Sequence, residues 1–154
     1  MTWLLNLFLL AATASLPRFS LGYQTGCPIL CQMNPIPLHS GSGTDNTKGE
    51  YAITVEPAGN GQYDVTLKGP SFQGFVMNVN GGQFITDNSD NRVELCSNGH
   101  AAITQSAPHS RNSITVRWVT QAEGVFTFGA TVVQDFNKYV NGITFTLNVT
   151  AAGR

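Results

Sequence analysis

The feature that most constrains this chain is a series of short segments in which apolar and polar residues alternate. Apolar residues occupy every second position over 51–55, 63–67 and 114–118. Successive side chains of a β-strand point to opposite faces, so a period of two predicts strands with one buried face. Helical spacing of apolar residues never extends beyond one turn, and 134–139 is the only segment expected to form such a turn. The chain is therefore expected to be all-β.

Glycine, proline and asparagine separate the remaining apolar segments. Further strands are expected at 72–79, 83–86, 93–96, 101–104, 124–134 and 143–149, with turns at 59–61, 69–70 and 80–82 and a polar loop at 86–91. Many short strands divided by turn residues are typical of two packed antiparallel sheets. We expect an immunoglobulin-like antiparallel β-sandwich of about eight strands. An irregular N-terminal arm, rich in proline and glycine, is expected to precede it.

The first 22 residues are typical of a secretory signal peptide. Residues 4–14 are almost wholly apolar, yet this stretch is too short to cross a hydrocarbon core of about 30 Å as a helix. Ser20 and Gly22 fit the small residues of a cleavage site, and cleavage after Ala14 is the alternative. No other apolar run approaches a span of about 18 residues. We expect a secreted protein that does not span a membrane, with one domain over 23–154.

Three cysteines, Cys27, Cys31 and Cys96, follow the expected cleavage point. In a secreted chain they are disulfide candidates, and their spacing does not match a zinc site because Cys96 has no near partner. A bridge from the N-terminal segment to Cys96 would close a loop of about 65 residues and stabilise the fold by about 4 kcal/mol. One thiol is left over, either free or in an intermolecular bridge.

The charge content excludes one class of partner. Charged residues make up 11% of the chain, and its 8 basic and 9 acidic residues give a net charge of -1. Neutralising several phosphates requires a cluster of Lys and Arg, so nucleic acid is not an expected partner. The polar surface comes mainly from Asn, Gly, Ser and Thr, which favours recognition by hydrogen bonds.

A hydrolase site is not expected, although serine and histidine are neighbours in one loop. Ser106 and Ser110 flank His109, but the chain has no Gly-x-Ser-x-Gly elbow and no carboxylate that the sequence would orient toward the histidine. We expect no enzymatic activity and no cofactor.

Metal binding is likewise not expected. The spacing of His39, His100 and His109 does not bring ligands together, so these are interpreted as loop residues. Asp87 and Asp90 lie in a polar loop without the pattern of an EF-hand, which favours a solvated loop over a calcium site.

The aromatic residues divide into core candidates and surface candidates. Strand spacing places four of them in the expected core: Phe75, Trp118, Phe126 and Phe128. An aromatic platform for sugars needs exposed rings, and Tyr23, Phe136 and Tyr139 are the candidates, with packing in the core or arm the favoured alternative. Asn148 begins the only N-glycosylation sequon and can carry a glycan if it is exposed.

Several fragments, taken in order, resemble the reeler domain. They are Tyr23-Gln24-Thr25-Gly26-Cys27-Pro28, Cys31 with Met33, Pro35 and His39, Phe72-Gln73-Gly74-Phe75, Cys96-Ser97, the strand 113–118 that ends in tryptophan, and 130–136 followed by Tyr139 and Gly142. Two positions depart from the family pattern. Gln105 stands where the family has histidine, and Val140 where it has an aromatic residue.

The resemblance implies a disulfide between Cys31 and Cys96. It leaves Cys27 as the odd thiol, which could link a homodimer. The family includes small secreted invertebrate defense proteins, so the resemblance also implies a non-enzymatic role in innate, antibacterial defence through binding of microbial surface glycans or lipids. Phosphate recognition would call for clustered cations, whereas Arg92, Arg111 and Arg117 are dispersed in the sequence, so a neutral glycan is preferred.

Two other functions stay open. One is an extracellular-matrix or adhesion module that assembles through protein contacts. The other, an electron-transfer subunit, is ranked last because the chain lacks the haem-bearing membrane segments that follow some reeler domains. The sequence does not locate a binding face.

Overall fold

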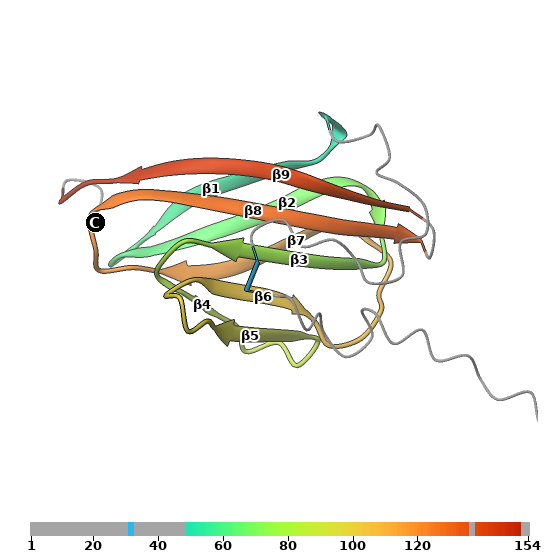
Figure 1. The fold of residues 1–154 in the computed structure, drawn as a ribbon, viewed down its shortest axis with the longest axis horizontal. Coiled ribbons are helices and arrows are strands. Elements are labelled where there is room, and N and C mark those ends of the chain that lie inside the picture. The colour runs from blue at the N-terminus through green and yellow to red at the C-terminus, as the bar shows by residue number, and fades with distance from the viewer. Residues whose placement is uncertain (1–30, 33–48, 136–137, 152–154) are drawn as a thin grey trace, which may run out of the picture.

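Two antiparallel sheets pack face to face in the computed structural model, which describes residues 31–32, 49–135 and 138–151 (Figure 1). The strands are β1 Ala52–Gly59, β2 Gln62–Phe72, β3 Gly74–Val79, β4 Gln83–Ile85, β5 Asn91–Leu95, β6 Ala101–Gln105, β7 Arg111–Val119, β8 Gly124–Asp135 and β9 Lys138–Val149. One sheet has the order β1-β2-β7-β4 and the other β5-β6-β3-β8-β9. These strands confirm the expected all-β sandwich.

Helices contribute nothing to this architecture within the described ranges. Short 3₁₀ turns occur at Gly49–Glu50 and at Ala151, and none of the described residues belongs to a helix long and apolar enough to cross a membrane. The signal peptide expected at 1–22, Tyr23, Cys27, His39 and Phe136 lie outside the described residues.

The turn between β1 and β2 follows from its glycines. Gly59, Asn60 and Gly61 have φ values of 88°, 55° and 70°. Two glycines adopt this left-handed region without steric cost, and asparagine tolerates it better than most residues. The hairpin expected at 59–61 is therefore confirmed, and it sets the register in which Ile53 faces Leu67 and Val55 faces Val65.

Two local expectations are wrong. Gly69 and Pro70 do not form a turn, because β2 continues through them to Phe72, which pairs with Arg111 beyond a register irregularity. A helical turn at 134–139 is also contradicted. Val133 faces Tyr139 and Asp135 faces Lys138, so the ladder between β8 and β9 extends almost to the connection between the two strands. Long-range pairing overrides the local signal in both places.

The turn expected at 80–82 does not join two paired strands. β3 belongs to the five-stranded sheet and β4 to the four-stranded sheet, so this connection carries the chain across the sandwich. Gly82 has a φ of 70° there, and its Cα lies against the indole of Trp118.

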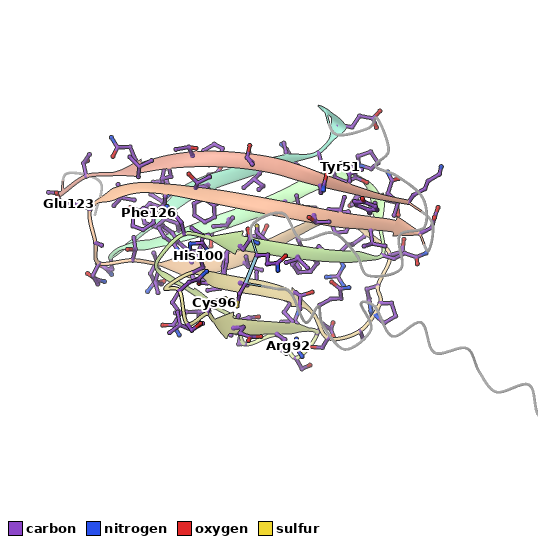
Figure 2. All side chains as sticks on the ribbon, in the orientation of Figure 1. Tyr51, Arg92, Cys96, His100, Glu123 and Phe126 are labelled. Carbon is purple, nitrogen blue, oxygen red and sulfur yellow. A yellow bond between two sulfur atoms is a disulfide. The ribbon has the colours of Figure 1, made fainter. Side chains whose placement is uncertain are left out.

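Aromatic side chains fill the space between the sheets. The fully buried ring of Trp118 lies 4.9 Å from Phe126, 5.1 Å from Phe128 and 5.3 Å from Tyr63, measured between ring centroids. Figure 2 shows Phe126 pointing into the sandwich from β8. Phe75 is also fully buried, so the four aromatic core residues expected from strand spacing are confirmed. Aromatic pairs of this geometry add about 0.5–1.5 kcal/mol each beyond their buried area.

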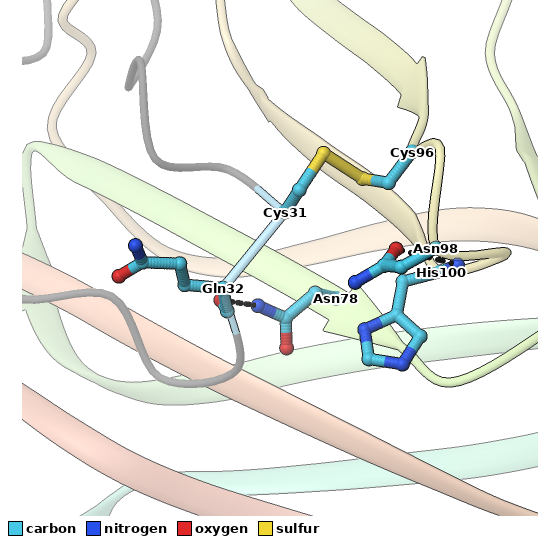
Figure 3. The surroundings of a disulfide bond; sticks show 6 residues. All are labelled: Cys31, Gln32, Asn78, Cys96, Asn98 and His100. Carbon is cyan, nitrogen blue, oxygen red and sulfur yellow. Dashed lines mark hydrogen bonds between the residues drawn. A yellow bond between two sulfur atoms is a disulfide. The ribbon is translucent and has the colours of Figure 1, made fainter.

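A disulfide joins Cys31 to Cys96, the residue that follows β5, with Cα atoms 5.6 Å apart (Figure 3). The neighbouring carbonyl oxygen of Gln32 accepts a 2.5 Å hydrogen bond from Nδ2 of Asn78 on β3. The covalent bond and the hydrogen bond thus attach residues 31–32 to the outer face of the five-stranded sheet. This is the cysteine pair that the family resemblance implies.

Candidate functional site

A groove of about 490 Å³ follows the part of β7 that β4 does not cover. β4 pairs only with residues 117–119 of β7, from Gln83 facing Val119 to Ile85 facing Arg117. Within the described residues, β7 before Arg117 has no partner strand on this side. The chain that leaves β4 forms the opposite wall. We call this site the β7 groove, lined by residues 85–88, 90, 91, 109, 111 and 113–117.

Main-chain groups of β7 face the groove. On the other side of β7, the amide of Thr120 donates a 3.0 Å hydrogen bond to the carbonyl oxygen of Gly61 at the start of β2. Residues that bond to β2 must then alternate along β7 with residues whose N–H and C=O point away from β2. Ser113 and Thr115 belong to the second set. Their backbone donors and acceptors are available in the groove, next to their exposed hydroxyl side chains.

The opposite wall is held in shape by its own hydrogen bonds. The amide of Asn88 donates to Oγ1 of Thr86 at 3.1 Å, and the amide of Asp90 donates to Oδ1 of Asn88 at 2.9 Å. The carbonyl oxygen of Asp90 accepts from the amide of Ser106 at 2.6 Å, which ties the wall to β6. Local turns of this kind are typical of Asn, Asp and Thr.

One residue of the groove lining has a buried side-chain acceptor without a hydrogen-bond partner among the described residues. This atom is Oδ1 of Asn91, the first residue of β5. A buried polar atom without a hydrogen bond is costly in a folded protein and is rare. A donor from a bound molecule or water would satisfy it.

Arg111 lies at one end of the groove. Its guanidinium carbon is 5.7 Å from the ring centroid of buried Phe75, and its Nε donates a 3.4 Å hydrogen bond to the carbonyl oxygen of His109. Burial lowers the pKa of Arg111, and the nearby carboxylate of Asp90 opposes that shift. The side chain stays cationic in either case, because arginine is effectively always protonated in proteins.

Arg117 lies farther along β7. Its Nε is 2.8 Å from Oδ1 of Asp64, and its Nη1 donates a 2.7 Å hydrogen bond to Oε1 of Gln62. The four charged side chains of the lining are Asp87, Asp90, Arg111 and Arg117, whose formal charges sum to zero (two minus two). The groove is therefore polar and electrically balanced.

The residues considered for a hydrolase site do not converge. His109 lines the groove, but the hydrogen bonds that the structure gives it involve its main chain, to Gln73 and to Arg111. Oγ of Ser110 lies 2.9 Å from Oγ of Ser71, and Ser106 bonds to Asp90 through its amide.

The residues considered for metal binding are placed apart as well. Asp87 and Asp90 lie in the groove wall, where Arg111 faces Asp90. His100 follows the disulfide turn, and its amide donates to Oδ1 of Asn98 at 3.1 Å (Figure 3). Across the described ranges, no three His, Cys, Asp or Glu side chains group around a common point.

Tyr139 is not a surface platform. Its side chain is only 8% exposed, so the favoured alternative of core packing holds and the platform interpretation is wrong. Among the described residues that line the β7 groove, none is Phe, Tyr or Trp. Asn148 and Thr150 of the sequon are both exposed, at the end of β9 and directly after it.

The comparisons with known proteins agree with this fold. A family model described as "Reeler domain" matches residues 30–151. The chain is similar to a crystal structure of the human F-spondin reeler domain (fragment 2), with 23% identity, a TM-score of 0.52 and coverage of 66% of this chain and 88% of that chain. It is also similar to the crystal structure of the Reelin-N domain of F-spondin, with 24% identity, a TM-score of 0.53 and coverage of 73% and 95%.

At these identities the similarity to solved structures shows the fold alone, and a comparison with curated protein sequences finds no match. The family model does more, because it spans most of the chain from just before Cys31 to just after β9. The chain belongs to the reeler domain family.

Proposed function

We propose that this protein is a secreted, non-enzymatic recognition module of innate defence, and that the β7 groove binds neutral glycans of microbial surfaces. The defence role rests on the resemblance to small secreted invertebrate defense proteins. The class of ligand rests on the groove.

The observation that carries the proposal is the set of hydrogen-bonding groups in the β7 groove. Main-chain N–H and C=O groups of Ser113 and Thr115 face a wall to which Asn88 and Asn91 contribute. A sugar hydroxyl both donates and accepts, so it needs donors and acceptors on facing walls. The groove offers both, at a volume of about 490 Å³ that accommodates a short oligosaccharide.

The charge balance favours a neutral glycan over a phosphorylated lipid headgroup. Arg111 and Arg117, dispersed in the sequence, come together in one groove, but the carboxylate of Asp90 in the same lining attracts the first and Asp64 forms an ion pair with the second. Phosphate recognition depends on cations that can turn both guanidinium donors toward the anion. Here each cation already has a carboxylate beside it.

Secretion has independent support. A disulfide such as Cys31–Cys96 persists in oxidising compartments and is rare in the cytosol. The sequence of residues 1–22 and the exposed sequon at Asn148 fit the same route, in which Asn148 would carry an N-linked glycan.

A binding panel tests the function. The mature protein would be incubated with immobilised neutral polysaccharides, with lipopolysaccharide and with intact bacteria. We expect saturable binding to a neutral polysaccharide and to bacteria that display it, with little change between 0.05 and 0.5 M salt, because few ion pairs are involved. Binding to none of these surfaces would contradict the proposal.

Assembly into an extracellular matrix or adhesion complex is the second candidate. It is favoured by an exposed strand edge at β5, whose Val93 and Leu95 are 39% and 66% exposed. Size-exclusion chromatography of the parent protein and of Cys27→Ser would show whether Cys27 links two chains. A dimer that disappears with Cys27→Ser supports covalent assembly, and a dimer that persists must use another surface.

A further inference from the structure

β5 is an edge strand whose outer side is uncovered in the described part of the chain. It pairs with β6 alone, and its last four residues, Arg92, Val93, Glu94 and Leu95, are all exposed. Figure 2 shows Arg92 at the margin of the molecule on this strand. The opposite edge strand of the same sheet, β9, is different, because it lies beside β1 of the other sheet.

The pairing with β6 determines which main-chain groups of β5 point outward. The amide of Cys96 donates to the carbonyl oxygen of His100 at 2.8 Å, and the amide of Ser106 donates to the carbonyl oxygen of Asp90 at 2.6 Å. Along β5, residues whose N–H and C=O groups bond to β6 alternate with residues whose N–H and C=O groups point away from β6. The N–H and C=O groups of the alternate residues therefore face away from β6: Asn91, Val93 and Leu95. The amide of Asn91 donates to the carbonyl oxygen of Asn88 at 3.0 Å, so Asn91 offers only its carbonyl oxygen to a second strand.

A second β5 strand can satisfy these groups, and the charges select its register. Antiparallel pairing centred on Val93 places Asn91 opposite Leu95 of the second copy. Val93 then exchanges hydrogen bonds with its own copy, and the carbonyl oxygen of Asn91 accepts from the amide of Leu95. The same register places Arg92 opposite Glu94. Centring the pair on Arg92 or on Glu94 would instead oppose two like charges on the axis, which destabilises a strand pair.

The side chains of β5 fit this register on both faces. Arg92 and Glu94 share the outer face with Thr104 and Ala102 of β6, whereas Val93 shares the inner face with Ile103. On the outer face, a symmetric pair makes two Arg92–Glu94 contacts. On the inner face it buries Val93 against its own copy and covers part of Leu95, two exposed apolar residues that the monomer leaves in water.

We propose that two copies of this protein associate through β5, antiparallel, about a two-fold axis at Val93, to join their five-stranded sheets. Natural edge strands avoid such pairing with repelling charges, proline or short length. β1 carries Glu56 and Pro57, and β4 has only three residues. β5 instead carries Arg92 and Glu94, and in the antiparallel pair each of them lies opposite the other residue of the second copy. Five residues form a small interface, so the dimer is transient and concentration-dependent.

Charge exchange tests the register. In a Cys27→Ser background, sedimentation velocity would compare the parent with Arg92→Glu, Glu94→Arg and the double exchange Arg92→Glu/Glu94→Arg. Each single variant opposes like charges and is expected to weaken dimerisation about tenfold. The double variant, and an equimolar mixture of the two single variants, restore opposite charges and are expected to recover it. Since Arg92 and Glu94 are both exposed, the melting temperature of each monomer serves as the control for folding.

Covalent trapping tests the axis. Val93→Cys in the same background is expected to form a disulfide-linked dimer on mild oxidation, because two copies of this residue face each other. Val125→Cys is the matched control, because Val125 is also an exposed apolar residue but lies on β8, and this variant is expected to stay monomeric. A parent that is monomeric at millimolar concentration, single charge variants that dimerise like the parent, or a mixture that fails to recover would overturn the proposal.

Discussion

The indole Nε1 of Trp118 donates a 3.0 Å hydrogen bond to the carbonyl oxygen of Gly81, in the connection that carries the chain from one sheet to the other. The next residue, Gly82, has a φ of 70°, and a Cβ atom there would lie 2.5 Å from the same nitrogen. The connection and the indole therefore fix each other. They also fix where β4 begins, with Gln83 opposite Val119 of β7.

Gly82→Ala is expected to destabilise the protein strongly. The left-handed backbone costs about 1 kcal/mol for alanine, and the contact with the buried indole adds about 1–3 kcal/mol. Gly99→Ala is the matched control, because Gly99 has a φ of 80° but no atom within 4 Å of the added methyl group. Urea unfolding measures both. Equal losses of stability would show that the indole does not constrain the crossing.

Removal of the disulfide is expected to lower the free energy of unfolding by about 4 kcal/mol, from the entropy of closing a loop with a sequence separation of 65. Cys31→Ala/Cys96→Ala is the variant, and guanidinium unfolding is the measurement. Cys27→Ser is the control and should leave stability unchanged, because Cys27 is not part of this bond. A large loss with Cys27→Ser would mean that the cysteines pair differently in solution.

Gln105 stands where the family has histidine, and it has a structural role. Its Oε1 accepts a 2.7 Å hydrogen bond from the amide of Phe75, and its side chain is 1% exposed. Gln105→Leu keeps the volume but leaves that amide unpaired, at a cost of about 1–3 kcal/mol. Gln83→Leu, at an exposed position, should change stability by less than about 0.5 kcal/mol. Thermal unfolding compares the two, and similar melting temperatures would refute this role.

Substitution of Asn91 is expected to affect glycan binding more than the stability of the protein. Its Oδ1 has no hydrogen bond among the described residues, so Asn91→Ala should cost little stability, within about 1 kcal/mol. If Oδ1 accepts a hydrogen bond from a bound glycan, the same variant should weaken glycan binding about five- to tenfold, since a hydrogen bond contributes about 1 kcal/mol. Unfolding and titration on the same preparations provide the test. Unaltered affinity would remove Asn91 from the binding site.

The strands could be predicted because local pattern and tertiary burial agree. Alternation at Val65, Leu67, Val116 and Trp118 marks the inner face of the four-stranded sheet, and all four side chains are buried there. The local sequence pattern fails to predict the structure where pairing between distant strands determines it. Gly69-Pro70 has the composition of a turn, yet β2 continues through it, between residues that pair with β7 at Lys68 and at Phe72.

The groove could not be predicted for a similar reason. Arg111, Arg117 and Asp90 come together only because β4 pairs with three residues of β7 and then ends. The chain reaches β4 by crossing between the sheets, at a turn whose composition suits a simple hairpin equally well. Asp87 and Asp90 illustrate the consequence, since they resemble calcium ligands in sequence but one of them faces a guanidinium group in space.

The central claim is that the β7 groove holds a neutral glycan, and calorimetric titration of the mature protein with a polysaccharide identified by the binding panel tests it most directly. Ser113→Tyr fills the groove from an exposed strand position, and Thr146→Tyr places the same ring on β9 of the other sheet. If the groove holds a neutral glycan, the parent and Thr146→Tyr bind it saturably, and Ser113→Tyr binds it at least about tenfold more weakly. Equal binding by Ser113→Tyr and the parent would contradict it.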